Sequence, residues 1–467
     1  GRPVGARTDV EISWISTGVL ASVVTQRLLS SGFMGSYLSQ PVTTKETEVG
    51  AGSGLEWVST SMQGWRTGME DAHIAKTNVD CGGAQYSVFG VFDGHGGREV
   101  ANFCKAHVPV FLDGQLRALH KSEDSPDGIR VDVIAEALVK TYNGMDEMLR
   151  RPESEEELLS YRKKRGFPQE GAEDAGGEGR DGAAANRNMS PQMQMVQDRL
   201  QAAVSADMQR AQERGALTSQ EAMRIAMGMS FLQRLEGSAE RPTAASADGA
   251  GPAFSAGCTA VCVIITDTHV VCANAGDSRA VLCRGGRAVP LSRDHKPNDR
   301  LERRRVLAAG GMVKEINTPG VNGRTGRVQY RVNGDLNLSR AIGDLRHKTR
   351  PDLRHDQQAI TSTPDVHYEV REPDDEFVVL ACDGVWDVRS NKQVCDEVRE
   401  GIRDGRSLQD IGETILDACL CQDPKAAQGM GADNMTLVIA KMEGTIAVNS
   451  ATPPRKLALC LPFRCLR

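Results

Sequence analysis

The sequence has no excess of positive charge, no cysteine pattern typical of zinc fingers and no apolar run long enough to cross a membrane. The formal net charge is −6, so we do not expect nucleic acid as a main partner. The 12 cysteines lack the paired spacing of metal fingers, and several fall in apolar runs, where a free thiol acts as a small hydrophobic residue. We therefore expect a reducing, intracellular compartment. The uncharged stretch Ile12 to Val24 is too short to span a bilayer.

The chain is long enough for a substantial core, with 467 residues of which 40% are hydrophobic. Residues 151–250 differ in kind from the rest, because they are rich in Glu, then Gly, then Met and Gln, and lack strand signals. We treat them as an insert in which Gly171 to Asn186 is disordered. Helical patterns follow over Pro191 to Arg214 and Ser219 to Leu235. Their methionines form either an adaptable docking face or the core of a self-packed helical hairpin, and we favour the hairpin.

The segment Met34-Gly35-Ser36-Tyr37-Leu38-Ser39 fits the N-myristoylation pattern, with Gly35 as the acylated residue if Met34 is the native start. One acyl chain holds a membrane only marginally, so it would give peripheral membrane contact. The alternative is a chance Met-Gly pair in a loop. The tail, residues 443–467, carries basic residues and cysteines among leucines. It is either a second membrane signal or, as we expect, a frayed terminus.

The stretch from Val88 to Gly97 carries the strongest local signal. An apolar run typical of a buried strand ends on Asp93, and Gly94 and His95 follow. A carboxylate, a nearly bare carbonyl and an imidazole are thus gathered within one turn, a combination that suits a hard cation with its waters. An isolated Asp-Gly pair is usually only a turn, so this site needs support from other segments.

Other acids stand at strand ends in the same way. Asp277, Asp383 and Asp433 each lie beside a glycine or asparagine next to an apolar run, and Glu70 and Asp71 interrupt another. Strands of packed sheets share their rims, so we expect these acids to converge on one edge. Such a cluster repels itself unless cations neutralise it, and oxygen ligands without thiolates select Mg²⁺ or Mn²⁺.

The remaining pattern predicts short strands and a few helices. The runs Cys258 to Thr266, His269 to Asn274 and Ser278 to Cys283 are joined by tight polar turns, which predicts an antiparallel meander. Residues 312–344 are rich in Gly and Asn and are predicted to form a loop over the site. Helical spacing is found over Arg98 to Leu112, Val131 to Leu149 and Leu301 to Ala309.

Taken together and in order, these motifs resemble the PP2C-type, metal-dependent protein serine/threonine phosphatases. The resemblance covers about residues 54–150 and 251–442, which leaves 1–53 as an N-terminal extension. The motifs are Arg66-Thr67-Gly68-Met69-Glu70-Asp71-Ala72-His73, Asp93-Gly94-His95-Gly96-Gly97, Gly257-Cys258-Thr259-Ala260, Asn274-Ala275-Gly276-Asp277-Ser278-Arg279, Asp294-His295-Lys296-Pro297, Leu338-Ser339-Arg340-Ala341-Ile342-Gly343-Asp344, Asp383-Gly384-Val385-Trp386-Asp387 and Asp433-Asn434.

The resemblance implies an α+β fold, a central β-sandwich of two antiparallel sheets flanked by helices, with a two-metal centre on one rim. It implies that Asp93 bridges both Mg²⁺ or Mn²⁺ ions. Glu70, Asp383 and Asp433 would complete the coordination of one ion, and the Gly94 carbonyl and water molecules would complete that of the other. Asp277 and Asp383 would hold a third, weaker ion.

The resemblance also implies roles for residues beside the metals. Arg66 would clasp phosphate oxygens with its planar guanidinium group, and Asp71 and Asp387 would hold metal-bound waters. A hydroxide shared by the ions would attack phosphorus directly. His95 is the candidate acid that protonates the departing alkoxide.

We therefore expect a phosphatase that acts on phosphoserine and phosphothreonine in proteins. It is expected to be monomeric and cytoplasmic, with membrane association or a nuclear location as alternatives. No cysteine is followed by a phosphate-cradling loop that ends in arginine, so a cysteine nucleophile is not expected. The main alternative is a pseudophosphatase scaffold that binds proteins through the insert, and a weaker one is a metal phosphodiesterase.

Overall fold

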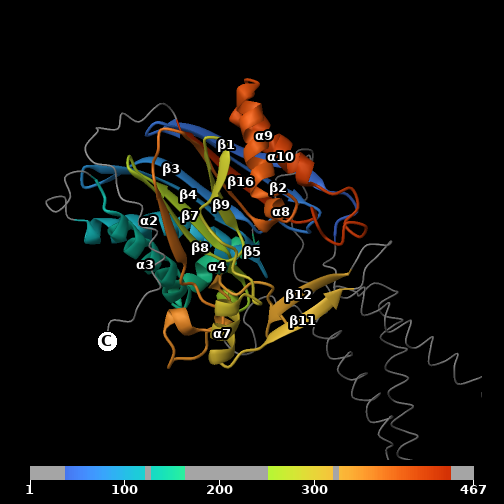
Figure 1. Cartoon of the computed structure of the whole chain (residues 1–467). Coiled ribbons are helices and arrows are strands. Elements are labelled where there is room, and N and C mark those ends of the chain that lie inside the picture. The colour runs from blue at the N-terminus through green and yellow to red at the C-terminus, as the bar shows by residue number, and fades with distance from the viewer. Residues whose placement is uncertain (1–36, 121–127, 164–250, 319–325, 443–467) are drawn as a thin grey trace, which may run out of the picture. The chain divides into compact units, whose positions relative to one another are not determined.

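The computed structural model describes residues 37–120, 128–163, 251–318 and 326–442. Up to residue 163 and from residue 252 onward, these residues belong to one compact unit. Two antiparallel sheets pack face to face, with helices on both outer sides (Figure 1). The predicted α+β fold with a central sandwich is therefore confirmed. Gly35, the tail and both helices predicted in the insert lie outside the described residues.

The first sheet has six strands in the order β1-β2-β16-β15-β9-β10. From Phe377 onward strand β15 is entirely apolar, because Val378 and Leu380 contact the other sheet while Phe377 and Val379 contact the outer helices. Because successive side chains point to opposite faces and both faces are covered, no polar position is required. The strands are β1 (Val42–Gly52), β2 (Leu55–Gly64), β9 (Arg279–Arg284), β10 (Arg287–Pro290), β15 (Asp375–Ala381) and β16 (Met435–Met442).

The second sheet has five strands in the order β14-β8-β7-β4-β3. Its strands are β3 (Ala72–Cys81), β4 (Ala84–Phe92), β7 (Ala260–Ile265), β8 (His269–Ala275) and β14 (Asp365–Val370). A short sheet in the order β13-β6-β5 and a hairpin of β11 and β12 accompany it. These strands are β5 (Gly94–His95), β6 (Gly257–Cys258), β11 (Val313–Thr318), β12 (Arg327–Val332) and β13 (Ile342–Gly343).

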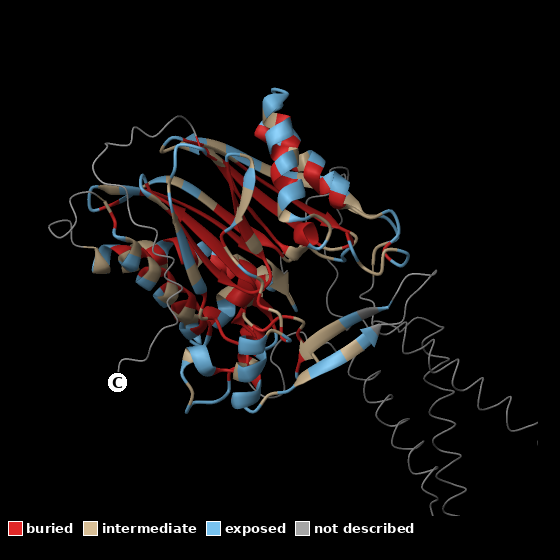
Figure 2. Cartoon of the chain, viewed as in Figure 1, coloured by how far each residue is buried: buried red, intermediate tan, exposed pale blue. Residues whose placement is uncertain are grey.

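Helices cover the outer face of each sheet. α2 (Glu99–Leu119) and α3 (Val131–Leu149) pack on the five-stranded sheet, and α9 (Asn391–Arg403) and α10 (Leu408–Cys419) pack on the six-stranded sheet. Figure 2 shows buried residues along the sheets and exposed residues on the outer sides of these helices. Among the described residues, no helix is both long and apolar enough to span a membrane. The shorter helices are α4 (Glu153–Lys163), α7 (Arg300–Ala308), α8 (Asp383–Trp386) and 3₁₀ turns at Pro252–Phe254, Leu345–His347 and His355–Gln357.

The folded unit extends beyond both predicted boundaries of the first core segment, residues 54 and 150. β1 lies in the predicted N-terminal extension but pairs with β2 almost along its whole length, from Val42 opposite Gly64 to Gly52 opposite Leu55. Its exposed and half-buried residues do not show the apolar pattern of the inner strands, because β1 is an edge strand. α4, which begins at Glu153 in the predicted insert, packs on α2 with Leu158 buried in the core.

Two further predictions about strands are corrected. β7 and β8 pair as expected, but β8 and β9 do not: the turn at Gly276-Asp277 carries the chain from the five-stranded to the six-stranded sheet. A tight turn between two apolar runs does not by itself say whether they share a sheet. The segment 312–344, predicted to be a loop, contains the hairpin of β11 and β12, with Val313 opposite Val332.

Candidate active site

Three carboxylates meet where strands of both sheets end. Asp93 follows β4 of the five-stranded sheet, Asp277 precedes β9 of the six-stranded sheet, and Asp383 follows β15 at the start of α8. One oxygen from each side chain lies within 4.8 Å of the others. Packing of the two sheets thus brings together three acids that are far apart in the sequence.

The three carboxylates of this group repel one another when all are ionised. Burial raises the pKa of Asp93 well above its usual value, and the neighbouring Asp383 raises it further. Burial and the nearby Asp277 do the same to the pKa of Asp383. A divalent cation would remove this repulsion, and an all-oxygen donor set fits Mg²⁺ or Mn²⁺. The residues present therefore fit a metal site.

Asp433 lies beside this group and is held by Arg66. The Nη2 atom of Arg66 is 2.5 Å from Oδ2 of Asp433. Burial alone would lower the pKa of Arg66, but the Asp433 carboxylate outweighs this effect and raises it. The sequence predicted a metal ligand and a phosphate clasp separately, and the structure places them in contact.

Glu70 and Asp71 approach the group from the start of β3. Burial raises the pKa of Glu70, although a backbone hydrogen bond from Gly97 and the charges of Arg66 and His95 oppose the shift. Glu70 is not one of the three acids within 4.8 Å. Asp71 is buried and accepts a hydrogen bond of 2.8 Å from Oγ1 of Thr436. Burial raises the pKa of Asp71 to about 7, although Thr436 opposes the shift.

The raised pKa of Asp71 predicts how stability depends on pH in the absence of metal. Because its folded-state pKa lies near 7, above its ordinary value of 3.8, the protonated side chain stabilises the fold at low pH, and this contribution is lost as pH rises through about 7. We expect Asp71→Asn to reduce the fall in unfolding free energy between about pH 5 and pH 8 by at least about 1 kcal/mol. Urea denaturation in a chelator measures this. Identical pH slopes in the two proteins would contradict it.

Two glycines after the acids allow other segments to approach. A Cβ on Gly94 would lie 2.2 Å from the backbone oxygen of Glu70, and one on Gly384 would lie 2.1 Å from that of Asn434. Neither glycine is among the residues with positive φ, so close packing, not a turn, requires them. The Asp-Gly pairs at 93–94 and 383–384 are therefore not simple turn signals, because each glycine lets a neighbouring acid-bearing segment come close.

Adding one methyl group at Gly384 should disturb this packing. We expect Gly384→Ala to lower the unfolding free energy by about 1–3 kcal/mol, because the neighbouring backbone must move. Gly114→Ala is the matched control, since a Cβ there meets nothing within 4 Å and alanine in helix α2 should stabilise by about 0.5–1 kcal/mol. Urea denaturation measures both. Equal effects of the two substitutions would show that the contact at Asn434 does not constrain position 384.

His95 is held by an acid that the sequence did not single out. Its Nε2 atom is 2.6 Å from Oδ2 of Asp344, a residue with no exposed surface and a left-handed φ of 50°. Burial alone would lower the pKa of His95, but the Asp344 carboxylate raises it above its ordinary value. His95 is thus poised to carry a proton near neutral pH.

Comparison with known proteins decides the family. The family model described as "Protein phosphatase 2C" matches residues 55–160 and 171–426. "Probable protein phosphatase 2C 11" from Oryza sativa subsp. japonica is 34% identical over 416 residues, covering 89% of this chain and 93% of that protein. "Protein phosphatase ppm-1.G" from Caenorhabditis elegans is 31% identical over 512 residues, covering 87% and 98%. This chain belongs to the protein phosphatase 2C family.

A solved structure, that of a phosphatase from a pathogenic strain of Toxoplasma gondii, has a TM-score of 0.49 at 18% identity and covers 86% of this chain and 96% of that one. The family resemblance predicted from the motifs is confirmed, and with it the assignment as a protein serine/threonine phosphatase. The family match extends through 171–250, the larger part of the segment that the sequence predicted to be an insert.

Two residues of this protein phosphatase 2C chain were present in the quoted motifs but had no role predicted for them. Asp344 ends the segment that begins at Leu338. Its position after a glycine at a strand end, like that of the other acids, could have marked it as a site residue. The other residue is Lys296, which forms an ion pair with Asp277, with Nζ 2.5 Å from Oδ2. Asp387, predicted to hold metal-bound waters, is exposed after α8, and its charge acts on Asp383 and Lys296.

Proposed function

We propose that this chain is an active phosphatase that hydrolyses phosphoserine and phosphothreonine in proteins with two Mg²⁺ or Mn²⁺ ions and, more weakly, a third. The observation that carries the proposal is the group formed by Asp93, Asp277 and Asp383, whose mutual repulsion calls for divalent cations. Asp93, Asp383 and Asp433, with Glu70 and the Gly94 carbonyl, would hold the two main ions. When bound, these ions supply a hydroxide nucleophile near neutral pH and stabilise charge on the phosphoryl group.

The side chains around the acids have separate tasks in this proposal. Arg66 binds and orients the phosphate group with paired N–H donors, and its contact with Asp433 keeps the guanidinium group at the site. His95 donates a proton to the departing seryl or threonyl oxygen. Asp344 orients the imidazole ring and favours its protonated form. Asp71 and Asp387 hold water molecules at the site.

The pseudophosphatase alternative is less well supported. A scaffold without activity has no need of carboxylates so close together that Asp383 raises the pKa of Asp93 and Asp277 raises the pKa of Asp383. A scaffold would also have no need for a histidine paired with a fully buried acid. We retain this alternative only as an outcome of the test.

The deciding experiment is hydrolysis of a phosphothreonine peptide, with and without Mn²⁺. We expect turnover that requires the ion and is lost in a chelator. Calorimetric titration with Mn²⁺ should show binding under the same conditions. A protein that binds Mn²⁺ but hydrolyses neither the peptide nor p-nitrophenyl phosphate would refute the proposed activity. A protein that binds no ion would favour the scaffold.

We extend the proposal to location and partners. Phosphoproteins are the substrates of a cytoplasmic or nuclear monomer, and acylation of Gly35 would add peripheral membrane contact. Mass spectrometry of the native N-terminus tests the acylation: an unmodified N-terminus, or one that begins elsewhere, would refute it.

A further inference from the structure

Lys296 places a positive charge inside the acidic group. Its Nζ atom is 2.5 Å from Oδ2 of Asp277, and the Asp277 side chain is only 2% exposed. Asp277 is also one of the three acids whose oxygens lie within 4.8 Å. The carboxylate that would take a third divalent ion therefore already has a cation from the chain itself.

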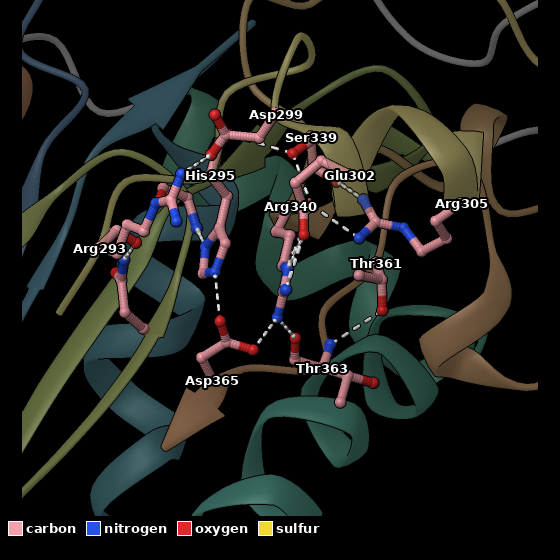
Figure 3. Close-up of polar contacts among 12 residues, drawn as sticks. Arg293, His295, Asp299, Glu302, Arg305, Ser339, Arg340, Thr361, Thr363 and Asp365 are labelled. Carbon is pink, nitrogen blue, oxygen red and sulfur yellow. Dashed lines mark hydrogen bonds and ion pairs between the residues drawn. The ribbon is translucent and has the colours of Figure 1, made fainter. Parts of the chain in front are cut away.

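The neighbouring His295 fixes the loop that carries Lys296. Its backbone N–H donates to the carbonyl of Gly276 at 2.9 Å, and its Nδ1 accepts from the N–H of Gly276 at 3.2 Å. The other ring nitrogen, Nε2, is 3.1 Å from Oδ2 of Asp365 (Figure 3). His295 precedes Lys296 and Gly276 precedes Asp277. The two residues of the ion pair are therefore linked by hydrogen bonds between their neighbours as well as by their own side chains.

A hydrogen-bond network that includes the buried residues Ser339 and Glu302 fixes the same loop from its other side. Ser339 donates its N–H at 3.2 Å, and its hydroxyl at 3.1 Å, to the carbonyl of His295. The Ser339 hydroxyl also lies 2.7 Å from Glu302, and Arg340 bridges Glu302 at 2.7 Å and Asp365 at 2.7 Å (Figure 3). Lys296 therefore differs from an ordinary surface lysine, because the residue before it, His295, is hydrogen-bonded to Gly276 and to Ser339.

We propose that the Lys296 ammonium group and a third divalent ion compete for Asp277, so that Lys296 is a built-in cation that weakens the third metal site. The inference rests on the proposed function. A second positive charge close to the same carboxylate is opposed by direct Coulomb repulsion from the ammonium group. Lys296 thus neutralises Asp277 when the third ion is absent and must leave Asp277 when that ion binds.

Calorimetric titration with Mn²⁺ tests the competition without relying on activity. Lys296→Met keeps most of the side-chain volume and removes the charge, so the affinity of the weakest site should rise at least about tenfold. Lys296→Arg keeps the charge and should leave that site weak. Lys392→Met is the control, since Lys392 is a 79% exposed lysine on α9, and it should change nothing. Equal affinity of the weakest site in the wild type and Lys296→Met would overturn the inference.

A second measurement needs no variant. In crystals of the wild-type protein grown at low and at high Mn²⁺, the Lys296 ammonium group should leave Asp277 as anomalous density for a third ion appears. Density for that ion with Lys296 still on Asp277 would overturn the inference, even if Lys296→Met did not fold. If two ions bind but the affinity of the third site is the same in the wild type and in Lys296→Met, only this inference fails. If neither the wild type nor any variant binds Mn²⁺, the proposed function fails as well.

Discussion

Asp93→Asn is expected to reduce turnover of a phosphothreonine peptide by at least about a thousandfold. Asp93 lies in the group of three acids and is proposed to hold both main ions. Asparagine keeps the shape but removes the negative charge, so both ions should bind more weakly. Steady-state hydrolysis at saturating Mn²⁺, together with calorimetric titration, measures the two effects.

The control for this prediction is Asp404→Asn, which removes a 56% exposed carboxylate at the end of α9. It should leave turnover and Mn²⁺ binding unchanged, because an exposed surface charge contributes little. Full turnover in Asp93→Asn would refute the metal assignment. Asp93→Asn should retain the fold, because it removes one of several carboxylates that repel one another in the metal-free protein.

His95→Gln is expected to slow hydrolysis of the phosphothreonine peptide by about 10²–10⁴-fold, the usual contribution of general acid catalysis. Hydrolysis of p-nitrophenyl phosphate should fall much less, because nitrophenolate leaves readily without a proton. Glutamine can still accept or donate a hydrogen bond at this position, so the comparison separates proton transfer from loss of structure. Rates on both substrates, measured with the same enzyme preparations, give the result.

His367→Gln is the control for this second prediction, because His367 is a 51% exposed histidine on β14. It should affect neither substrate. Equal losses on the peptide and on the aryl phosphate would remove His95 as the acid. The pH profile adds a further check: the Asp344 carboxylate raises the pKa of His95, so activity on the peptide should persist to higher pH than an ordinary histidine allows and then fall as His95 loses its proton.

Local patterns predicted the core strands well and the edges poorly. β15 and β16 were evident, because strands covered on both faces carry long apolar runs, here Phe377 to Ala381 and Leu437 to Ala440. The edge strand β1 was missed, since its half-exposed residues carry no such constraint. The crossing between β8 and β9 was missed because the choice of sheet depends on partners such as β14 and β15, which lie about a hundred residues further along the chain.

The sequence by itself determined the family, the central strands and the acids that stand at their ends. These features are local, because an apolar run, a following carboxylate and a small neighbour can be recognised within a few residues. Only the tertiary structure decided which charges meet: Arg66 with Asp433 across 367 residues, His95 with Asp344 across 249, and Lys296 with Asp277 across 19. The physical reason is that such pairs depend on how two sheets stack and on where a crossing strand enters, and no short stretch of sequence encodes that geometry.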